Sequence, residues 1–227
     1  MRLILLRHGR TAWNAERRFQ GQADPPLDEV GRAQAYEVAA LIAALRPQLL
    51  VSSDAQRATQ TAVPLGKVTG VSVTIEPRLR ERSLGHWEGL TRDDVAAQFP
   101  DEYADWIAGG DVSRRGGETR DQVAARAVAA FTDLPEVETA VLVTHSATAM
   151  ALCNSLLGIP QQIHPLGPLA NCHWSELMAE QDDLAERNDG VAPRWRLRAH
   201  NIGAPGGVAP LPVLLGELGE DAPDADA

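Results

Sequence analysis

The chain has 227 residues, of which 44% are hydrophobic and 23% are charged, so we expect a soluble globular protein with a sizeable core. Its formal net charge of −10 disfavours nonspecific binding to nucleic acid or to an anionic membrane surface. No apolar run approaches the roughly 18 residues of a membrane-spanning helix. The apolar run at residues 3–6 is also too short for a secretory signal, since arginines follow it directly.

The two cysteines, Cys153 and Cys172, belong to no CxxC pair or zinc-type cluster. Unclustered cysteines of this kind predict reduced thiols and a cytoplasmic protein. The closing stretch GELGEDAPDADA carries five acidic residues and no basic one, and Gly and Pro are frequent just before it. We therefore expect one catalytic domain over residues 1–203 and a flexible acidic tail over residues 204–227.

Segments with the pattern of a buried strand alternate along the chain with segments of helical pattern. Asp28 is a candidate N-cap, and Pro64 is expected to kink or break its helix. The alternation predicts an α/β fold, a three-layer α/β/α sandwich around a mostly parallel central sheet. We expect strands over residues 2–6, 48–53, 71–77, 140–144, 172–180 and 194–201. Helices are expected between them over residues 27–45, 55–70, 91–100, 118–134 and 147–157. A loop or hairpin at 185–193 should join the last two strands.

Reactive polar residues follow four of the predicted strands. Arg7 and His8 follow the first strand, Arg57 lies early in the helix after the second, Glu81 follows the third, and His145 follows the fourth. Because the carboxyl ends of parallel strands meet at one edge of a sheet, we expect these five side chains to cluster there.

Such a cluster suits the transfer of a phosphoryl group. Two arginine side chains directed at one point would bind its oxygens, helix N-termini after the first and fourth strands would add N–H donors, and Gly9 would let the backbone approach the ligand. Neighbouring cations would keep His8 neutral near pH 7, and a neutral imidazole can attack phosphorus. Glu81 could then protonate the departing alkoxide.

Six segments match a known family in order and spacing. The segment LLRHGRTAWN at 5–14 resembles the opening signature of the histidine phosphatase superfamily, also called phosphoglycerate mutase-like. The resemblance covers residues 1–201. It implies the phosphoglycerate mutase-like fold and metal-independent chemistry through a phosphohistidine, with no metal site and no cofactor. The other matching segments are FQGQADPPLDEVGRAQA, SSDAQRATQTA, RLRERSLGHWEG, GGETRDQVAAR and VLVTHSATAMAL.

The resemblance assigns roles to the clustered residues. It makes His8 the nucleophile and Glu81 the proton donor, and it places Arg7, Arg57 and His145 around the phosphoryl group.

Four further positions bear on substrate binding. Asn14 and Gln20 match positions that contact phosphate or substrate in many members of the family. The chain departs from the family at Arg10, where glutamate or glutamine is frequent, and at Ser146, where glycine is frequent. Arg10 could change the charge at the pocket mouth, whereas Ser146 would narrow the phosphate site and keep its N–H donor.

Hydrolysis is the expected reaction, because the region between Gly89 and Gly117 is short and an acidic tail would repel a phosphorylated ligand. The alternatives are phosphoryl transfer of the phosphoglycerate mutase type and a catalytically silent protein that binds a phosphate ligand. The expected partner is a small phosphorylated metabolite, with no nucleic acid and no membrane, and a homodimer is an option because it is common in the family.

Four segments narrow the candidate substrates further. LLVSSD, RLRERSLGHWEGLT, LGPLANCHWSEL and RWRLRAHN resemble an actinobacterial subgroup of the family that hydrolyses glucosyl-3-phosphoglycerate.

Other polar and aromatic residues are interpreted as structural. We expect Glu88 to brace a turn. Arg114 and Arg115 lie in an expected loop, where they could reach the far end of the substrate or be solvated, and solvation is the favoured interpretation. Four histidines have no metal-like spacing and are interpreted as structural: His86, His164, His173 and His200. Four tryptophans are interpreted as packing residues: Trp87, Trp106, Trp174 and Trp195. Asp24, Asp93 and Asp94 lack the convergent partners that a metal site would need.

Overall fold

Six strands form one mixed sheet at the centre of the molecule, in the order β3-β2-β4-β1-β5-β6. The computed structural model describes residues 1–180 and 194–204. The first four strands of the chain run parallel to one another. The fifth strand pairs antiparallel with the first, and the sixth pairs antiparallel with the fifth. The predicted mostly parallel sheet is therefore confirmed. The strands are β1 (Arg2–Arg7), β2 (Leu49–Ser52), β3 (Val73–Ile75), β4 (Thr139–Thr144), β5 (Trp174–Ala179) and β6 (Trp195–Ile202).

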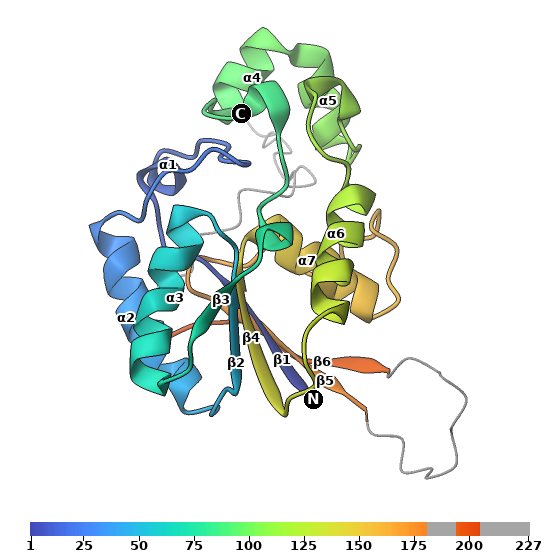
Figure 1. Ribbon diagram of the computed structural model, residues 1–227. Helices are drawn as coiled ribbons and strands as arrows, with labels where there is room; N and C mark the ends of the chain where they lie inside the picture. Colours follow the sequence, from blue (N-terminus) through green and yellow to red (C-terminus); the bar gives the residue numbers. More distant parts are fainter. Residues whose placement is uncertain (181–193, 205–227) are drawn as a thin grey trace, which may run out of the picture.

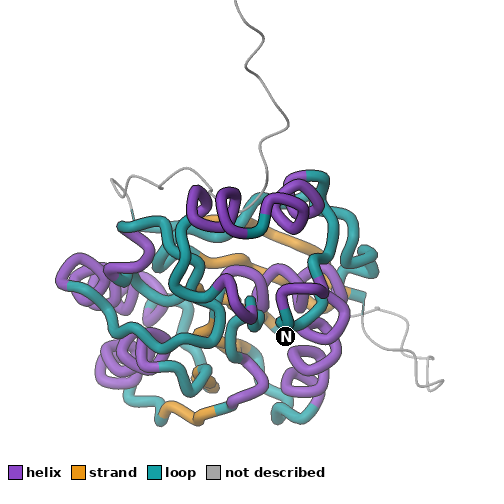
Figure 2. The backbone as a smooth tube through the Cα atoms, turned by 90° about the horizontal axis from the view of Figure 1, so that it is seen from above, coloured by secondary structure: helices purple, strands orange, loops and turns teal. Residues whose placement is uncertain are grey.

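Helices cover both faces of this sheet, which confirms the three-layer sandwich (Figures 1 and 2). On one face, Ile4 and Leu6 of β1 pack against α2 (Glu29–Ala43) and α3 (Gln56–Thr69). On the other face, Leu3 and Leu5 pack against α6 (Arg120–Thr132) and α7 (Ser146–Leu156). Alternate residues of a strand point to opposite faces, so a strand covered on both sides must be apolar throughout.

Local signals decide where two of the helices begin and end. The side chain of Asp28 accepts a hydrogen bond from the Gly31 N–H and caps α2, as predicted. The helix expected over residues 55–70 is confirmed, and of the two alternatives for Pro64, a kink or a break, the break is wrong because α3 runs through Pro64 to Thr69. Pro64 is buried between buried neighbours, and this packing outweighs the hydrogen bond that proline removes.

Short helices lie over the carboxyl ends of the parallel strands (Figure 1). Two of them were not predicted. The helix α1 (Ala12–Ala15) is about one turn long and shows no apolar period, and α5 (Pro100–Ile107) begins at the proline where the expected helix over 91–100 ends. The capping box between Thr11 and Asn14 was the signal that could have revealed α1. The remaining short elements are α4 (Arg92–Gln98) and the 3-10 helices η1 (Pro77–Leu79), η2 (Gly85–Trp87) and η3 (Ser113–Arg115).

Among the described residues, no helix combines the length and apolar character needed to cross a membrane. The predicted acidic tail lies almost wholly outside the described residues, and the predicted connection at 185–193 lies wholly outside them.

Candidate active site

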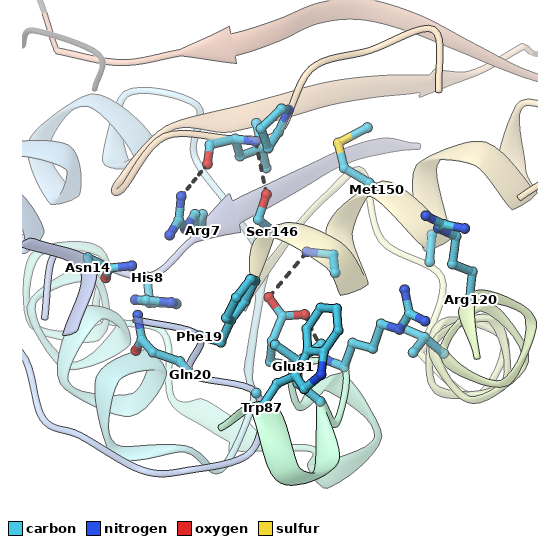
Figure 3. Close-up of a pocket in the computed structure, with 18 of the residues that line it drawn as sticks. Arg7, His8, Asn14, Phe19, Gln20, Glu81, Trp87, Arg120, Ser146 and Met150 are labelled. Carbon is cyan, nitrogen blue, oxygen red and sulfur yellow. Dashed lines mark hydrogen bonds between the residues drawn. The ribbon is translucent and has the colours of Figure 1, made fainter. Parts of the chain in front are cut away.

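A cavity of about 280 Å³ opens where β1 and β4 end. Residues from both strand ends line it, together with residues of the segments that lie over the sheet (Figure 3). The structure therefore brings together most of the residues expected at this edge. Seven of the eight predicted site residues line the cavity: Arg7, His8, Asn14, Gln20, Arg57, Glu81 and Ser146.

His8 is fixed by the register between β1 and β4. Arg7 lies opposite Thr144 in this parallel pair, and the His8 N–H donates to the Thr144 carbonyl at 3.0 Å. The ring Nδ1 lies 2.7 Å from the carbonyl oxygen of Gly9. Because a carbonyl only accepts, Nδ1 carries the proton, and the neutral ring keeps a lone pair on Nε2. That lone pair is the nucleophile required for attack on phosphorus.

The environment of His8 favours its neutral form. Only 3% of the residue is exposed. Burial, and then the positive charges of Arg57 and Arg7, hold the pKa of His8 well below its usual value of 6.5. The expectation that the ring is neutral near pH 7 is thus supported on physical grounds.

His145 lies next to His8 and does not line the cavity. The ring centroids of the two histidines are 5.1 Å apart. The Nε–H of Arg57 donates to His145 Nδ1 at 3.3 Å, so the proton of the neutral ring is on Nε2, which donates to Ser53 Oγ at 3.0 Å. Both ring nitrogens therefore contact protein partners, and His145 orients Arg57 in this state.

Burial and neighbouring cations also lower the pKa of His145, so both histidines should make stability depend on pH. Below about pH 6.5 the unfolded chain takes up protons on these rings that the folded protein does not, and the free energy of unfolding falls as pH falls. We expect His8→Gln to reduce this slope by up to about 1.4 kcal/mol per pH unit. Urea denaturation at several pH values from about 7 to about 5 measures it. Parallel curves for variant and wild type would contradict a neutral buried His8.

The two arginines contribute differently to the pocket. Arg57 is 1% exposed, and besides its Nε–H bond to His145 it donates to the carbonyls of Ala23 at 2.6 Å and Gly21 at 2.8 Å. These three bonds leave two of its five N–H groups without a hydrogen-bond partner in the protein. Arg7 donates to the Leu169 carbonyl at 2.6 Å, while its buried Nε has no hydrogen-bond partner. Burial lowers the pKa of Arg7 to about 10, so it stays a cation near neutral pH.

Glu81 is held at the N-terminus of α7. Its carboxylate accepts the N–H groups of Ala147 and Thr148, each at 3.2 Å, and that of Arg82 at 2.8 Å (Figure 3). Two of the N–H donors that we expected to face phosphate from this helix therefore orient Glu81 instead. Its carboxyl group lines the cavity and is available for proton transfer.

The three predicted binding residues Asn14, Gln20 and Ser146 differ in whether their side-chain oxygens already accept hydrogen bonds within the protein. The Oε1 atom of Gln20 is buried without a partner, and the Gln20 side chain lies beside His8 in Figure 3. Asn14 Oδ1 accepts from the Thr11 N–H at 3.1 Å. Ser146 Oγ accepts the Leu169 N–H at 3.1 Å, so its hydroxyl supports the loop that also holds Arg7.

Gly9 and Arg10 do not act as expected from the sequence. A Cβ on Gly9 would lie 2.5 Å from the Gly31 carbonyl oxygen, so this glycine is needed for close packing on α2, and it does not line the cavity. The Arg10 guanidinium pairs with Asp28 at 2.8 Å and is also absent from the lining. This departure from the family therefore leaves the charge of the cavity wall unchanged.

The structure also shows cavity residues that the sequence analysis treated as structural. Arg115, expected to be solvated, is 2% exposed and lines the cavity, whereas its neighbour Arg114 is exposed and paired with Asp105. Trp87 and Trp106 pack in an aromatic cluster and line the cavity as well. Nothing in the sequence distinguishes the two arginines, because burial here depends on how η3 folds back over η2.

The predicted turn role of Glu88 agrees with its contacts. Its carboxylate accepts N–H groups of Gln22 at 3.0 Å, Ala23 at 3.1 Å and Leu84 at 3.0 Å. Within residues 1–180 and 194–204, no three or more His, Cys, Asp or Glu side chains are arranged to hold a metal ion.

Comparison with known proteins agrees with this geometry. A family model described as histidine phosphatase superfamily (branch 1) matches residues 3–188. The chain belongs to the histidine phosphatase superfamily. A glucosyl-3-phosphoglycerate phosphatase from Mycobacterium tuberculosis is 38% identical over 215 residues, which cover 89% of this chain and 95% of that protein. A protein named probable phosphoglycerate mutase GpmB from Erwinia tasmaniensis is 33% identical, with 80% and 86% covered.

Solved structures show the same relationship. The structure of a mycobacterial glucosyl-3-phosphoglycerate phosphatase in complex with VO3 is similar with a TM-score of 0.75 and 38% identity. The match covers 88% of this chain and 98% of that one. The superfamily member described here is accordingly an enzyme, a hydrolase of phosphomonoesters.

Proposed function

We propose that this histidine phosphatase acts on a small phosphorylated metabolite through a phosphohistidine formed at Nε2 of His8. The assignment of Nε2 as the attacking atom rests on one observation. Nδ1 of His8 lies 2.7 Å from the Gly9 carbonyl oxygen, which leaves Nε2 as the free nitrogen of a ring that lines the cavity. The other residues then take roles that follow from their contacts.

In the first step, the Nε2 lone pair attacks phosphorus and the bond from phosphorus to the ester oxygen breaks. Arg7 and Arg57 stabilise the charge on the phosphoryl oxygens, and Gln20 and Asn14 orient the group. Glu81 donates its proton to the departing alkoxide. In the second step, water attacks the phosphohistidine, Glu81 takes a proton from that water, and inorganic phosphate leaves with His8 restored. Ser146 supports the wall of the site, and contact of His145 with the phosphoryl group stays a prediction.

Glucosyl-3-phosphoglycerate is the first candidate substrate, because it gives its name to relatives that are 38% identical over most of both chains. The cavity is also large enough to hold more than a phosphoryl group. A phosphate-release assay over sugar phosphates, phosphoglycerates, nucleotides and this compound tests the proposal. We expect the highest kcat/KM for the glycosylated phosphoglycerate, and equal rates on simple aryl phosphates would contradict it.

Phosphoglycerate mutase-type transfer is the second candidate, because relatives of that name match four fifths of the chain. The two functions differ in which acceptor takes the phosphoryl group. Incubation with 3-phosphoglycerate should release inorganic phosphate faster than it forms the 2-isomer. The reverse order of rates would favour the mutase.

We expect Glu81→Gln to slow the enzyme most on esters with poor leaving groups. An alkoxide needs a proton when it leaves, whereas an aryl oxide does not, so kcat/KM should fall by roughly 10²–10⁴-fold for alkyl phosphates and much less for p-nitrophenyl phosphate. Steady-state kinetics on both substrates measure the difference. The matched control is Glu136→Gln, an exposed carboxylate outside the cavity lining. Equal losses on both substrates would show that Glu81 is not the proton donor.

A further inference from the structure

Glu81 lies in a segment without regular secondary structure. Residues 80–84 connect η1 with η2, and neither a helix nor a strand fixes their backbone. The backbone N–H and carbonyl groups of such a segment need partners from elsewhere in the protein. The position of the candidate proton donor therefore depends on the side chains that hold this segment.

Arg126 of α6 holds the segment through its carbonyl groups. Its Nη1 donates to the carbonyls of Arg78 and Arg80, each at 2.7 Å, and its Nη2 donates to the Glu81 carbonyl at 3.0 Å. The remaining N–H groups donate to the Glu118 carboxylate, from Nε at 2.8 Å and from Nη2 at 2.9 Å. All five N–H donors of the guanidinium thus have partners, which fixes both its position and its plane.

Glu118 continues this contact on the other side of Glu81. Its Oε2 accepts the Ser83 N–H at 2.9 Å, and its own N–H donates to the Ser83 carbonyl at 3.0 Å. Gln22 adds a longer contact, from Nε2 to the Glu81 carbonyl at 3.3 Å. The pair of Glu118 and Arg126 therefore holds the chain both before and after the candidate proton donor.

The helix α7 holds the other end of the same residue. The Glu81 carboxylate accepts the N–H groups of Ala147 and Thr148 (Figure 3), and Thr148 Oγ1 donates to the Arg80 carbonyl at 2.6 Å. The carboxylate is thus directed by α7, whereas the backbone is held by Arg126 from α6. A proton donor must lie within hydrogen-bond reach of the leaving oxygen, and a misplacement of about 1 Å can cost on the order of 10²-fold in rate.

We propose that Arg126 is a positioning residue for the proton donor, since its hold on the Glu81 backbone keeps the carboxyl group within reach of the leaving oxygen. Glu118 fixes the Arg126 guanidinium in this role. Neither Arg126 nor Glu118 lines the cavity, so both act through Glu81 and not on the substrate. The inference rests on the proposed function and deepens it, because it requires Glu81 to be the general acid.

Substrates that differ in their leaving group test the proposal. Arg126→Gln should lower kcat/KM for an alkyl phosphate by about 10- to 10²-fold. The value for p-nitrophenyl phosphate should fall only a few fold, because an aryl oxide leaves without a proton. A side chain needed only for folding would lower both values by the same factor.

Arg78→Gln is the matched control for the loss of a guanidinium. Arg78 belongs to the held segment, but its own side chain pairs with Glu76 and Asp133, each at 2.7 Å, and does not line the cavity. This variant should retain the wild-type kcat/KM on both esters within a few fold.

A second variant and a double mutant extend the test. Arg126→Lys keeps a cation beside Glu118 but offers fewer fixed donors to the carbonyls, so its alkyl-specific loss should be smaller than that of Arg126→Gln. In protein that already carries Glu81→Gln, replacing Arg126 should add no further loss specific to the alkyl ester, because the acid is already absent. Kinetics are measured well below the Tm of each variant.

The outcomes separate this inference from the proposed function. Equal losses on both esters in Arg126→Gln, beside an alkyl-specific loss in Glu81→Gln, would overturn the positioning role and leave the phosphatase and its acid intact. A further alkyl-specific loss in the double mutant would do the same. Equal losses in Glu81→Gln would overturn both the acid and this inference, and no phosphate release from any ester by the wild type would overturn the proposed function itself.

Discussion

Replacing His8 by alanine is expected to lower kcat by on the order of 10⁴- to 10⁶-fold on every substrate, because the attacking nitrogen is removed. The neighbouring Arg7 and Arg57 can still bind a phosphoryl group, but water then has to attack phosphorus directly without a nitrogen nucleophile. Steady-state phosphate release from p-nitrophenyl phosphate measures the loss, and a binding assay with vanadate shows whether the pocket still holds an oxyanion.

The control for His8 is His86→Ala. His86 lies outside the cavity lining, with its ring against Phe99 and Glu102. It should retain the wild-type rate within a few fold. Intact hydrolysis by His8→Ala would mean that water attacks phosphorus directly and that the ring only binds.

Replacing Arg57 by lysine should lower kcat/KM by about 10²–10³-fold, comparable to the loss of one donor to a developing oxyanion. Lysine keeps the charge but cannot reach His145, Gly21 and Ala23 at the same time as the ligand, because only the planar guanidinium has donors in several fixed directions. The loss should therefore appear in kcat as well as in KM, since the remaining donors would no longer be held in place.

Arg57→Lys also leaves buried carbonyls without a donor, which costs roughly 1–3 kcal/mol of stability, so kinetics are measured well below its Tm. Arg10→Gln is the matched control, because Arg10 is close to His8 in sequence and yet outside the cavity lining. It should change kcat/KM little. A lysine variant as active as wild type would show that charge alone suffices at position 57.

Much of the site could be predicted because it follows the ends of parallel strands. A buried strand shows as an apolar run, and the residue after it must lie at the sheet edge, which placed His8 and Arg57 at the correct end of the molecule. Adjacent strands then bring His8 and His145 together, since β1 pairs with β4. The same reasoning could not tell which way each side chain turns. In the structure His145 contacts Ser53 and Arg57 and does not line the cavity.

Residues far from strand ends were beyond the reach of this reasoning. Arg114 and Arg115 are neighbours in an irregular segment without apolar periodicity, and only the tertiary fold makes one exposed and the other buried. Gly9 was assigned to ligand approach because its partner Gly31 lies in a separate helix. At Pro64 the local rule that proline breaks a helix predicted the wrong result, because the tertiary fold buries Pro64 inside a continuous helix.

The most direct measurement is a search for the covalent intermediate. The enzyme is mixed with a radiolabelled phosphomonoester, quenched within one turnover at alkaline pH, and digested for mass spectrometry. The account predicts a phosphoryl group on His8 that is stable in base, lost in acid and absent from the His8→Ala protein. Burst kinetics with the label on another residue, or rapid turnover with no labelled enzyme at any time, would contradict attack by the His8 ring.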